Sequence, residues 1–345
     1  MTKTNENAAK NKSGNYFVKF AFYYRMKKLN IQRYSAANKS LWDNFVSTAD
    51  VHSILFFRDF MEYHSDRFTD YSHMIYKEKK LIAVFPANIN DNHDVHSHQG
   101  LSYGGVLFKP HTSFNIRLNV YQQLLQFLEI NKVETLFTKS IPNCYCNDFS
   151  ENLIFQWLKG ECVRTDIYSY LPKASYFNPN RNRMRHLKKV IDVEIRATDE
   201  LAEFWNQVLI PNLEKRFNVR PVHSIAEMER LVSNFKKQIR FYGAYQKGVL
   251  RAGVVLFVHR NVVHAQYSAG DENREDGSLD LLLDFVIRKY NTDKAFSFGT
   301  SSERQGEQIN EGLLYWKESF RSNNGIQQFF EIKTKNHSAL QNRLQ

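Results

Sequence analysis

The sequence is poor in cysteine, proline and glycine, and this scarcity excludes several classes of protein. Three cysteines among 345 residues are too few for a disulfide framework, and Cys144 and Cys146 lack the further ligands of a thiolate zinc site. Fourteen glycines and seven prolines leave little material for low-complexity linkers or repeats. No apolar run approaches a membrane span, and residues 1–15 lack the apolar segment of a signal peptide. We therefore expect a cytoplasmic protein with reduced thiols and no membrane partner.

Acidic residues are outnumbered by basic ones. The 47 Lys and Arg against 36 Asp and Glu give a formal net charge of +11 and a pI near 9.3. Such a surplus indicates an anionic partner, and both nucleic acid and a phosphorylated small molecule satisfy this description. The basic residues gather in 23–33 and 181–189. A non-enzymatic nucleic-acid-binding protein is one hypothesis, and it predicts retention on heparin that falls steeply with salt.

The length and the apolar content fit two domains of mixed α/β structure. A 42% hydrophobic fraction with 27 Phe and 18 Tyr can fill two cores. The order helix, hairpin, strand, helix, strand, helix occurs twice, with the hairpins at 71–89 and 240–258. Prolines and small polar residues cluster at 171–180. We therefore predict tandem domains at 1–175 and 176–345.

Each predicted repeat continues from its hairpin into a glycine-containing strand. The first is 96–108, which begins with HSHQGLSYGG, and the second is 261–270. Apolar periodicity and capping residues predict the elements that follow. In the first half these are helix 113–130, strand 133–141 and helix 150–160; in the second they are helix 278–290, strand 295–301, helix 307–320 and strand 326–333.

The strongest local signal for a binding site begins at His264. A strand ends at Gly270, a polar loop covers 271–277, and Ser278 can cap the next helix. Free N–H groups and the helix dipole make such a helix start attractive to anions. The loop is acidic apart from Arg274, however, so an ordinary strand-to-helix connection also fits.

Other candidate residues lie near the ends of predicted elements. Glu303 stands at the polar end of a strand, where ligands of open α/β sheets bind. Tyr315 could donate a proton inside a cleft or simply belong to the core. Arginines in 181–189 recur at near-helical spacing and fit either a phosphate site or a solvated face. The histidine spacing in 93–98 matches no standard zinc site, so we predict no metal.

Two motifs in the second half resemble those of a known enzyme family. The segment FGTSSERQGEQIN is similar to the F-G-x-S-x-E-x-x-G-x-x-x-N segment of FemAB-like proteins. YWKESF looks like the Y-x-K-x-G-F ending of their last helix, with Ser319 where glycine is usual. The chain thus resembles the GNAT acyltransferases, and in its doubled arrangement the FemAB-like branch, over roughly residues 40–332. It departs from the GNAT pyrophosphate loop, because NREDGS retains a single glycine.

The resemblance implies a tandem GNAT fold and an acyl-CoA-dependent N-acyltransferase. The chain is similar in pattern to bacterial enzymes that move 3-hydroxybutanoyl from coenzyme A onto dTDP-3-amino-3,6-dideoxygalactose. Those enzymes serve the synthesis of surface polysaccharides such as O-antigen or capsule. A neutral sugar amine would attack the thioester directly, without a covalent enzyme intermediate. The first domain would have lost its acyl-CoA site, with HSHQGLSYGG left facing the cleft between domains.

The resemblance also assigns roles to individual residues. The catalytic candidates are His264, Tyr267, Glu303 and Tyr315. The residues expected to hold coenzyme A are Gln266, Ser268, Gly270, Asn273, Arg274, Gly277, Ser278 and Asn310. Those expected to hold the sugar nucleotide are His98, Gln99, Ser102, Tyr103, Arg183 and Arg185.

Two questions stay open at this point. His264 and Tyr267 are an odd number of residues apart, so strand alternation puts them on opposite faces unless the strand bulges between them. The donor is the second question, because FemAB-like enzymes of wall-peptide type use aminoacyl-tRNA. That class carries a long helical arm, whereas residues 200–240 predict two ordinary helices, which favours coenzyme A. The oligomeric state is open.

Overall fold

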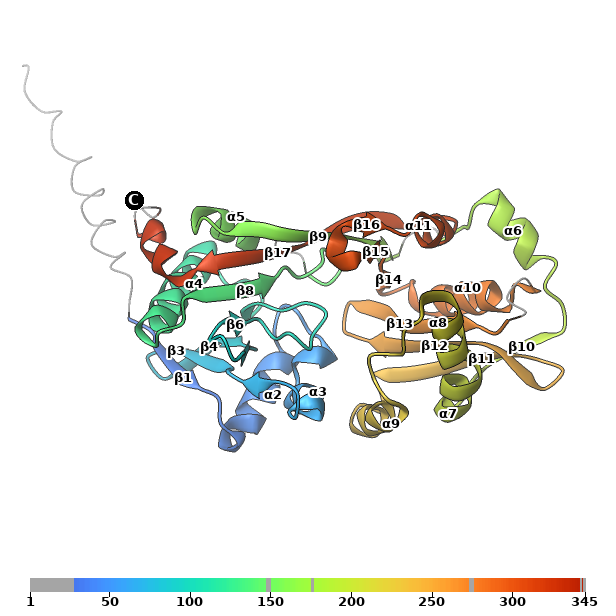
Figure 1. Cartoon of the computed structure of the whole chain (residues 1–345), viewed down its shortest axis with the longest axis horizontal. Coiled ribbons are helices and arrows are strands. Elements are labelled where there is room, and N and C mark those ends of the chain that lie inside the picture. The colour runs from blue at the N-terminus through green and yellow to red at the C-terminus, as the bar shows by residue number, and fades with distance from the viewer. Residues whose placement is uncertain (1–27, 147–149, 175–176, 273–275, 342, 344–345) are drawn as a thin grey trace, which may run out of the picture.

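The computed structural model describes residues 28–146, 150–174, 177–272, 276–341 and 343, and Figure 1 shows how their elements are arranged. Two halves, each with sheet and helices, lie side by side along the long axis. The first half contains β1 (Asn30–Arg33), α2 (Lys39–Ser47), α3 (Arg58–Met61), β2 (Thr69–Asp70), β3 (His73–Lys77), β4 (Lys80–Phe85), β5 (Asn88–Ile89), β6 (Val95–His96), β7 (Leu107–Phe108), α4 (Phe114–Ile130), β8 (Thr135–Lys139), α5 (Ser150–Trp157) and β9 (Glu161–Leu171).

The second half begins with α6 (Arg181–Leu187) and β10 (Val193–Ala197). It continues through α7 (Leu201–Glu203), a π-helical turn at Phe204–Leu209, α8 (Ile210–Phe217), α9 (Ile225–Asn234), β11 (Ile239–Gln246), β12 (Val249–Val258), β13 (Val262–Gly270), α10 (Ser278–Tyr290), β14 (Ala295–Thr300), β15 (Ser302–Glu303), β16 (Gln308–Ile309), α11 (Glu311–Glu318) and β17 (Asn323–Lys333). The two helical segments between 200 and 240 confirm the expectation that this region has no long arm.

One sheet runs through both halves. Its strand order is β10-β11-β12-β13-β14-β9-β17-β8-β6-β5-β2, and β1-β3-β4-β7 form a second sheet. The C-terminal strand β17 lies between β8 and β9, so residues 323–333 complete the sheet of the first half (Figure 1). The boundary predicted near residue 175 therefore does not assign every later residue to the second half. The last strand, β17, belongs to the sheet of the first half.

The hydrophobic core also continues across the halves. One buried cluster combines Trp42 and Phe60 of the first half with Trp205 and Phe257 of the second. Smaller clusters lie under α4 in the first half and under α10 in the second. The halves are consequently fixed against each other by apolar packing, which is non-directional and grows with the buried area.

The predicted hairpins and several helices are confirmed. β3 pairs with β4 and β11 with β12, both antiparallel. Helix α10 has the predicted bounds because its buried residues recur at helical spacing, on Leu282, Leu283, Val286 and Ile287. The helix predicted from residue 307 is wrong in its first turn. Residues 308–309 instead pair with 302–303, and α11 starts only after Asn310, which caps it.

The predicted strand 96–108 is also wrong in its middle. Only its two ends form strands, β6 and β7, and the residues between them are loop. His98 has a φ of 67° and Gly105 a φ of 118°, which no strand accommodates. Gly104 lies so close to the backbone of Ser97 that a Cβ atom there would approach the Ser97 carbonyl oxygen to 2.0 Å. Tight packing of the loop explains its glycine content.

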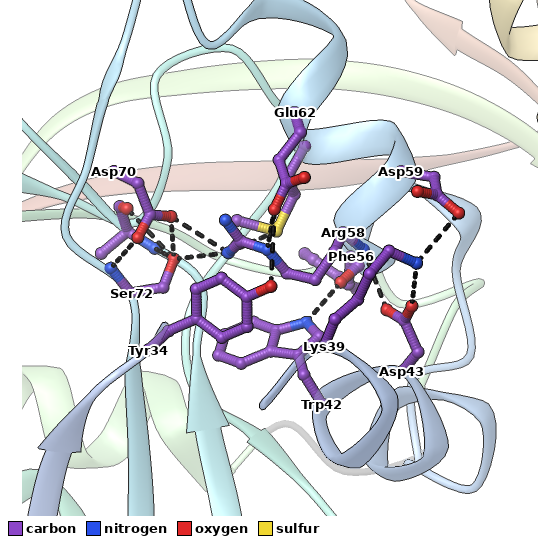
Figure 2. A network of polar contacts seen from close by, with 12 residues as sticks. Tyr34, Lys39, Trp42, Asp43, Phe56, Arg58, Asp59, Glu62, Asp70 and Ser72 are labelled. Atoms are coloured by element: carbon purple, nitrogen blue, oxygen red, sulfur yellow. Dashed lines mark hydrogen bonds and ion pairs between the residues drawn. The ribbon is translucent and has the colours of Figure 1, made fainter. Parts of the chain in front are cut away.

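A buried arginine holds the first half together next to this loop. Arg58 is 3% exposed, and its guanidinium bonds to Glu62 and Asp70 at 3.0 Å and to Ser72 at 3.2 Å. It also lies 3.7 Å from the centre of the Tyr34 ring (Figure 2). A buried charge is tolerated only when it is paired in this way. The network therefore connects α3 to β2 and to the residues that follow β1 and precede β3.

Candidate active site

Two neighbouring strands of the second half diverge and leave a wedge in the sheet. β13 and β14 are parallel partners only from Val262↔Ala295 to His264↔Ser297. Beyond this point β13 stays with β12, whereas β14 pairs with β9. The carboxyl ends of parallel strands are where ligands of α/β sheets bind. The wedge therefore has the geometry of a ligand-binding site.

A cavity of about 450 Å³ opens at this wedge and is lined by both halves. The second half contributes β13 and β14, and the first half contributes β9 and the loop between β6 and β7. Its lining comprises Leu101, Ser102, Tyr103, Lys139, Pro142, Tyr145, Arg164, Asp166, Tyr168, His264, Ala265, Gln266, Ser297, Phe298, Gly299, Thr300, Gln327 and Phe329. The structure thus brings together four of the predicted site residues, Ser102, Tyr103, His264 and Gln266.

A β-bulge settles the orientation of His264 and Tyr267. Val255 is paired with Tyr267 and the next residue, Leu256, with Ala265, so Gln266 is the extra residue on β13. The bulge restores His264 and Tyr267 to the same face of the sheet despite their odd spacing. Only His264 reaches the cavity, since Tyr267 packs against Trp205 in the core between the halves.

His264 is half-buried at the point where the strands separate. Its Nδ1 lies 3.1 Å from the hydroxyl of Ser297. Burial, followed by the nearby charge of Lys317, lowers the pKa of the imidazole to about 4. Gly299, with a φ of 75°, leaves room for the ring, because a Cβ there would lie 3.3 Å from its Cε1 atom. His264 is consequently neutral at pH 7 and able to accept a hydrogen bond.

Lys317 of α11 lies directly behind the same strand ends. It is 3% exposed, and its Nζ donates to the carbonyl oxygens of Gly299 at 3.0 Å and Thr300 at 2.5 Å. No carboxylate partner is found for it within the described residues. Burial lowers the pKa of Lys317 to about 7, so the side chain exchanges a proton near neutrality. Lys317 belongs to the YWKESF motif but was not among the predicted site residues.

The other three catalytic predictions do not reach the cavity. The hydroxyl of Tyr267 lies 2.6 Å from Nδ1 of His223, and burial raises its pKa to about 12. Glu303 accepts a hydrogen bond from Asn310 at 2.6 Å and so closes the small β15–β16 hairpin. Tyr315 is 63% exposed. These positions do not support roles as base or acid at the wedge.

The loop between β6 and β7 is held by side chains from distant strands. Lys139 donates to the carbonyl oxygens of His98, Gln99 and Leu101. Gln327 of β17 donates to that of Ser102 at 2.9 Å. Four main-chain acceptors are thereby satisfied, which fixes the loop in one conformation.

Individual loop residues differ in where their side chains point. Tyr103 is buried, and its hydroxyl lies 2.8 Å from that of Ser53. His98 is buried away from the cavity, stacked on His64. Gln99 is tied to Asn88 by two hydrogen bonds of 2.7 Å. Of the loop residues predicted to hold the sugar nucleotide, only Ser102 and Tyr103 therefore line this cavity.

Of the residues predicted to hold coenzyme A that the structure describes, only Gln266 lines the cavity at the wedge. Ser268 is exposed on β13. The carbonyl of Gly270 accepts a hydrogen bond from Asn212 at 2.9 Å. Gly277 has a φ of 83° before α10, where the backbone N–H of Ser278 is bonded to Asp276. Asn273 and Arg274 lie outside the described residues. Asn310 caps α11 and does not contact the wedge.

The arginines predicted for the nucleotide phosphates lie on α6, at the far end of the second half (Figure 1). Arg183 forms an ion pair with Asp280 of α10 and donates to Ser319 at 3.0 Å. Arg185 is exposed and lines a groove beside Arg321. Neither lines the cavity at the wedge, and the guanidinium of Arg183 is already occupied.

No set of three or more His, Cys, Asp or Glu side chains in the described residues is placed to hold a metal ion. Within the same part of the chain, every helix is too short or too polar to span a bilayer.

Comparison with known proteins agrees with this geometry. Residues 175–304 match the family model described as an acetyltransferase (GNAT) domain. The fold is similar to that of FemX, with a TM-score of 0.64 at 8% identity over 89% of this chain and 98% of that one. It is also similar to the C-terminal domain (DUF2156) of a putative lysylphosphatidylglycerol synthetase from Agrobacterium fabrum, with a TM-score of 0.57 at 9% identity over 90% and 96% of the two chains.

A tandem GNAT protein from the clavulanic acid biosynthesis pathway aligns with a TM-score of 0.48 at 12% identity, over 89% of this chain and 99% of that one. No curated protein sequence matches the chain. Residues 175–304 therefore match a GNAT acetyltransferase domain, and the mixed α/β fold is similar to that of FemX.

Proposed function

We propose that the protein is an acyl-CoA-dependent N-acyltransferase whose acceptor is a nucleotide-linked amino sugar. The sequence resemblance implies 3-hydroxybutanoyl and dTDP-3-amino-3,6-dideoxygalactose as the reacting pair, in the cytoplasmic synthesis of a surface polysaccharide. The observation that carries the proposal is the divergence of β13 and β14 over a cavity lined by both halves. Such a site can admit a donor from the second half and an acceptor from the first.

The donor side follows from the geometry of β13. Its pairing with β14 ends at His264, so the following residues have no partner strand on that side. The pantetheine arm of an acyl-CoA can pair there as an added strand, through main-chain hydrogen bonds. The bulge at Gln266 turns the backbone at the same place, and its N–H groups are candidates to stabilise the oxyanion of the tetrahedral intermediate.

The proton transfer requires a group that can change its charge near pH 7. In the reaction the amine nitrogen forms the amide bond as the C–S bond breaks, and one amine proton ends on the departing thiolate. His264 remains neutral at pH 7 and accepts a hydrogen bond from the amine, which orients its lone pair. Lys317, with a pKa of about 7, does not line the cavity itself, but its Nζ bonds to the carbonyl oxygens of Gly299 and Thr300, which do. It is suited to take up that proton and to return it from behind these strand ends. This assignment replaces Tyr315, which is exposed.

The proposal is tested by release of free thiol from a panel of acyl-CoAs mixed with nucleotide-linked amino sugars. The expected result is thiol release that requires both substrates and appears with one amide product by mass spectrometry. Absence of release with every pair, together with transfer from an aminoacyl-tRNA, would establish the tRNA-dependent alternative. Steep salt-dependent retention on nucleic acid without any transfer would establish the non-enzymatic one.

A further inference from the structure

A second, wide cavity lies beside the one at the wedge. It measures about 830 Å³. Its floor is formed by β6, β8, β17 and β9, which are neighbouring strands of the long sheet. Its wall is the turn Arg304–Gly306 from the second half. We call it the sheet groove.

The sheet groove adjoins the cavity at the wedge. Lys139, Arg164 and Phe329 line both. A molecule bound along the floor of the sheet groove can therefore extend one end past these three side chains toward His264. An acceptor that is held by one end and reacts at an amine on its other end needs such adjoining cavities.

Aromatic rings offer flat surfaces at the floor of the sheet groove. The imidazole of His96 is stacked on the ring of Phe137, with centroids 4.8 Å apart and planes 11° from parallel. Phe329 lies under the guanidinium of Arg164, 4.4 Å from its ring centre. Rings in this arrangement can stack on a planar base, as aromatic side chains do in nucleic-acid sites.

Cations line the sheet groove between these rings and the wedge. Arg164 is held in plane by two hydrogen bonds to Asp166, of 2.9 and 2.6 Å. Arg304 is exposed and has no ion-pair partner within the described part of the chain. Glu307 is the acidic side chain among the groove's lining residues. Arg304, together with the one nitrogen of Arg164 that does not bond to Asp166, suits the oxygens of a diphosphate.

We propose that the sheet groove binds the nucleoside diphosphate part of the acceptor. The base stacks near Phe137, the diphosphate lies against Arg164 and Arg304, and the sugar amine projects to His264. This inference rests on the proposed function for the identity of the acceptor. It moves the nucleotide site from α6, where Arg183 is paired with Asp280, to the first half of the sheet.

The test is equilibrium binding of dTDP and of thymidine to the full chain, by calorimetry. Arg304→Gln is expected to weaken binding of dTDP at least tenfold and to leave thymidine unchanged, because it removes a phosphate contact. Phe137→Leu is expected to weaken both ligands severalfold, because it removes a stacking surface. The matched control is Arg321→Gln, since Arg321 is also an exposed arginine with a left-handed φ, 62° against 48° for Arg304.

Several outcomes would overturn the inference. Unchanged dTDP binding in Arg304→Gln and Phe137→Leu, with loss in Arg185→Gln, would return the site to α6. Tighter binding of a short RNA ending in CCA than of dTDP, sensitive to the same substitutions, would assign the groove to a tRNA end.

Failure of the proposed function is distinguishable from failure of this inference. If dTDP binds as expected but no acyl-CoA releases thiol, the nucleotide site in the sheet groove is supported and the proposed reaction is refuted. If thiol release is observed and Arg304→Gln leaves the KM for the nucleotide sugar unchanged, the reaction stands and the groove does not.

Discussion

Replacing Lys317 by Met should make the protein more stable and less active. The lysine is buried without a carboxylate partner in the described residues, and burial lowers its pKa from 10.5 to about 7. A tenfold change in proton affinity corresponds to about 1.4 kcal/mol, so keeping the ammonium in the folded state costs about 5 kcal/mol. Methionine has a similar shape and no charge, but it leaves the carbonyls of Gly299 and Thr300 without their donor, at a cost of about 1–3 kcal/mol. The expected net gain at pH 7 is about 2–4 kcal/mol.

The pH dependence gives this prediction its sharpest form. Below the folded pKa of about 7, both folded and unfolded Lys317 carry the proton and the full cost applies. Between about 7 and 10.5 only the unfolded state binds it, so the wild type gains stability relative to Lys317→Met as the pH rises. The slope is about 1.4 kcal/mol per pH unit. The other titrating groups are common to both proteins, and His264, whose pKa of about 4 depends in part on Lys317, stays neutral from pH 6 to 9, so their contributions cancel in the difference.

Urea denaturation at pH 6, 7, 8 and 9 measures this difference, with Tyr315→Phe as the control on the exposed face of the same helix. The stability gap should be nearly constant from pH 6 to 7 and narrow by about 2 kcal/mol from pH 7 to 9, because the full slope is reached only above the folded pKa. The kcat of Lys317→Met should fall about 10²–10⁴-fold, and that of Tyr315→Phe should not change. A gap that stays the same at every pH would show that Lys317 titrates at its usual value, and the proposed proton transfer would lose its basis.

Three further predictions concern the neighbouring residues. Gly104→Ala forces a Cβ against the Ser97 carbonyl and should cost about 3 kcal/mol in urea denaturation; unchanged stability would mean that the loop can move aside. His264→Gln should lower kcat yet keep the break in the pH–rate profile near pH 7, since the imidazole pKa is about 4; disappearance of that break would assign it to His264. Arg183→Ala removes the ion pair with Asp280 and should cost about 2 kcal/mol without raising the KM for the nucleotide sugar, and a raised KM would restore Arg183 to the acceptor site.

Local pattern was sufficient for the elements whose contacts are local. The hairpins and α10 were predicted because alternation and helical periodicity are written in the residues themselves. The loop after β6 was misread as strand because its conformation depends on Lys139 and Gln327, which reach it from other strands. The return of β17 to the first half was not predicted, since it depends on pairing with β8 and β9 across the whole chain.

Local sequence also could not predict which residues line the candidate site. Tyr315 and Lys317 are two residues apart on α11, so about 200° of rotation separates them and burying one exposes the other. Nothing in the residues YWKESF says which of the two faces the sheet, and a tyrosine is the usual choice for a buried position. The sequence also could not predict whether β13 has a bulge at Gln266, because the bulge depends on the register between β12 and β13.

The proposed function needs one acyl-CoA site, and the two halves differ where such a site would lie. In the second half β13 and β14 begin as partners and then separate, whereas their counterparts β7 and β8 lie in different sheets. A cavity of about 320 Å³ lies where the chain enters β7 and leaves β8, at Val106 and Ser140. It is also lined by Arg117, which lies 3.5 Å from Asp50 and 3.8 Å from Glu151. A pantetheine arm entering there would have to displace ion-paired groups, and a charge left unpaired in a buried position costs several kcal/mol. Under the proposed function, the acceptor therefore binds to the first half, at the loop before β7 and in the sheet groove.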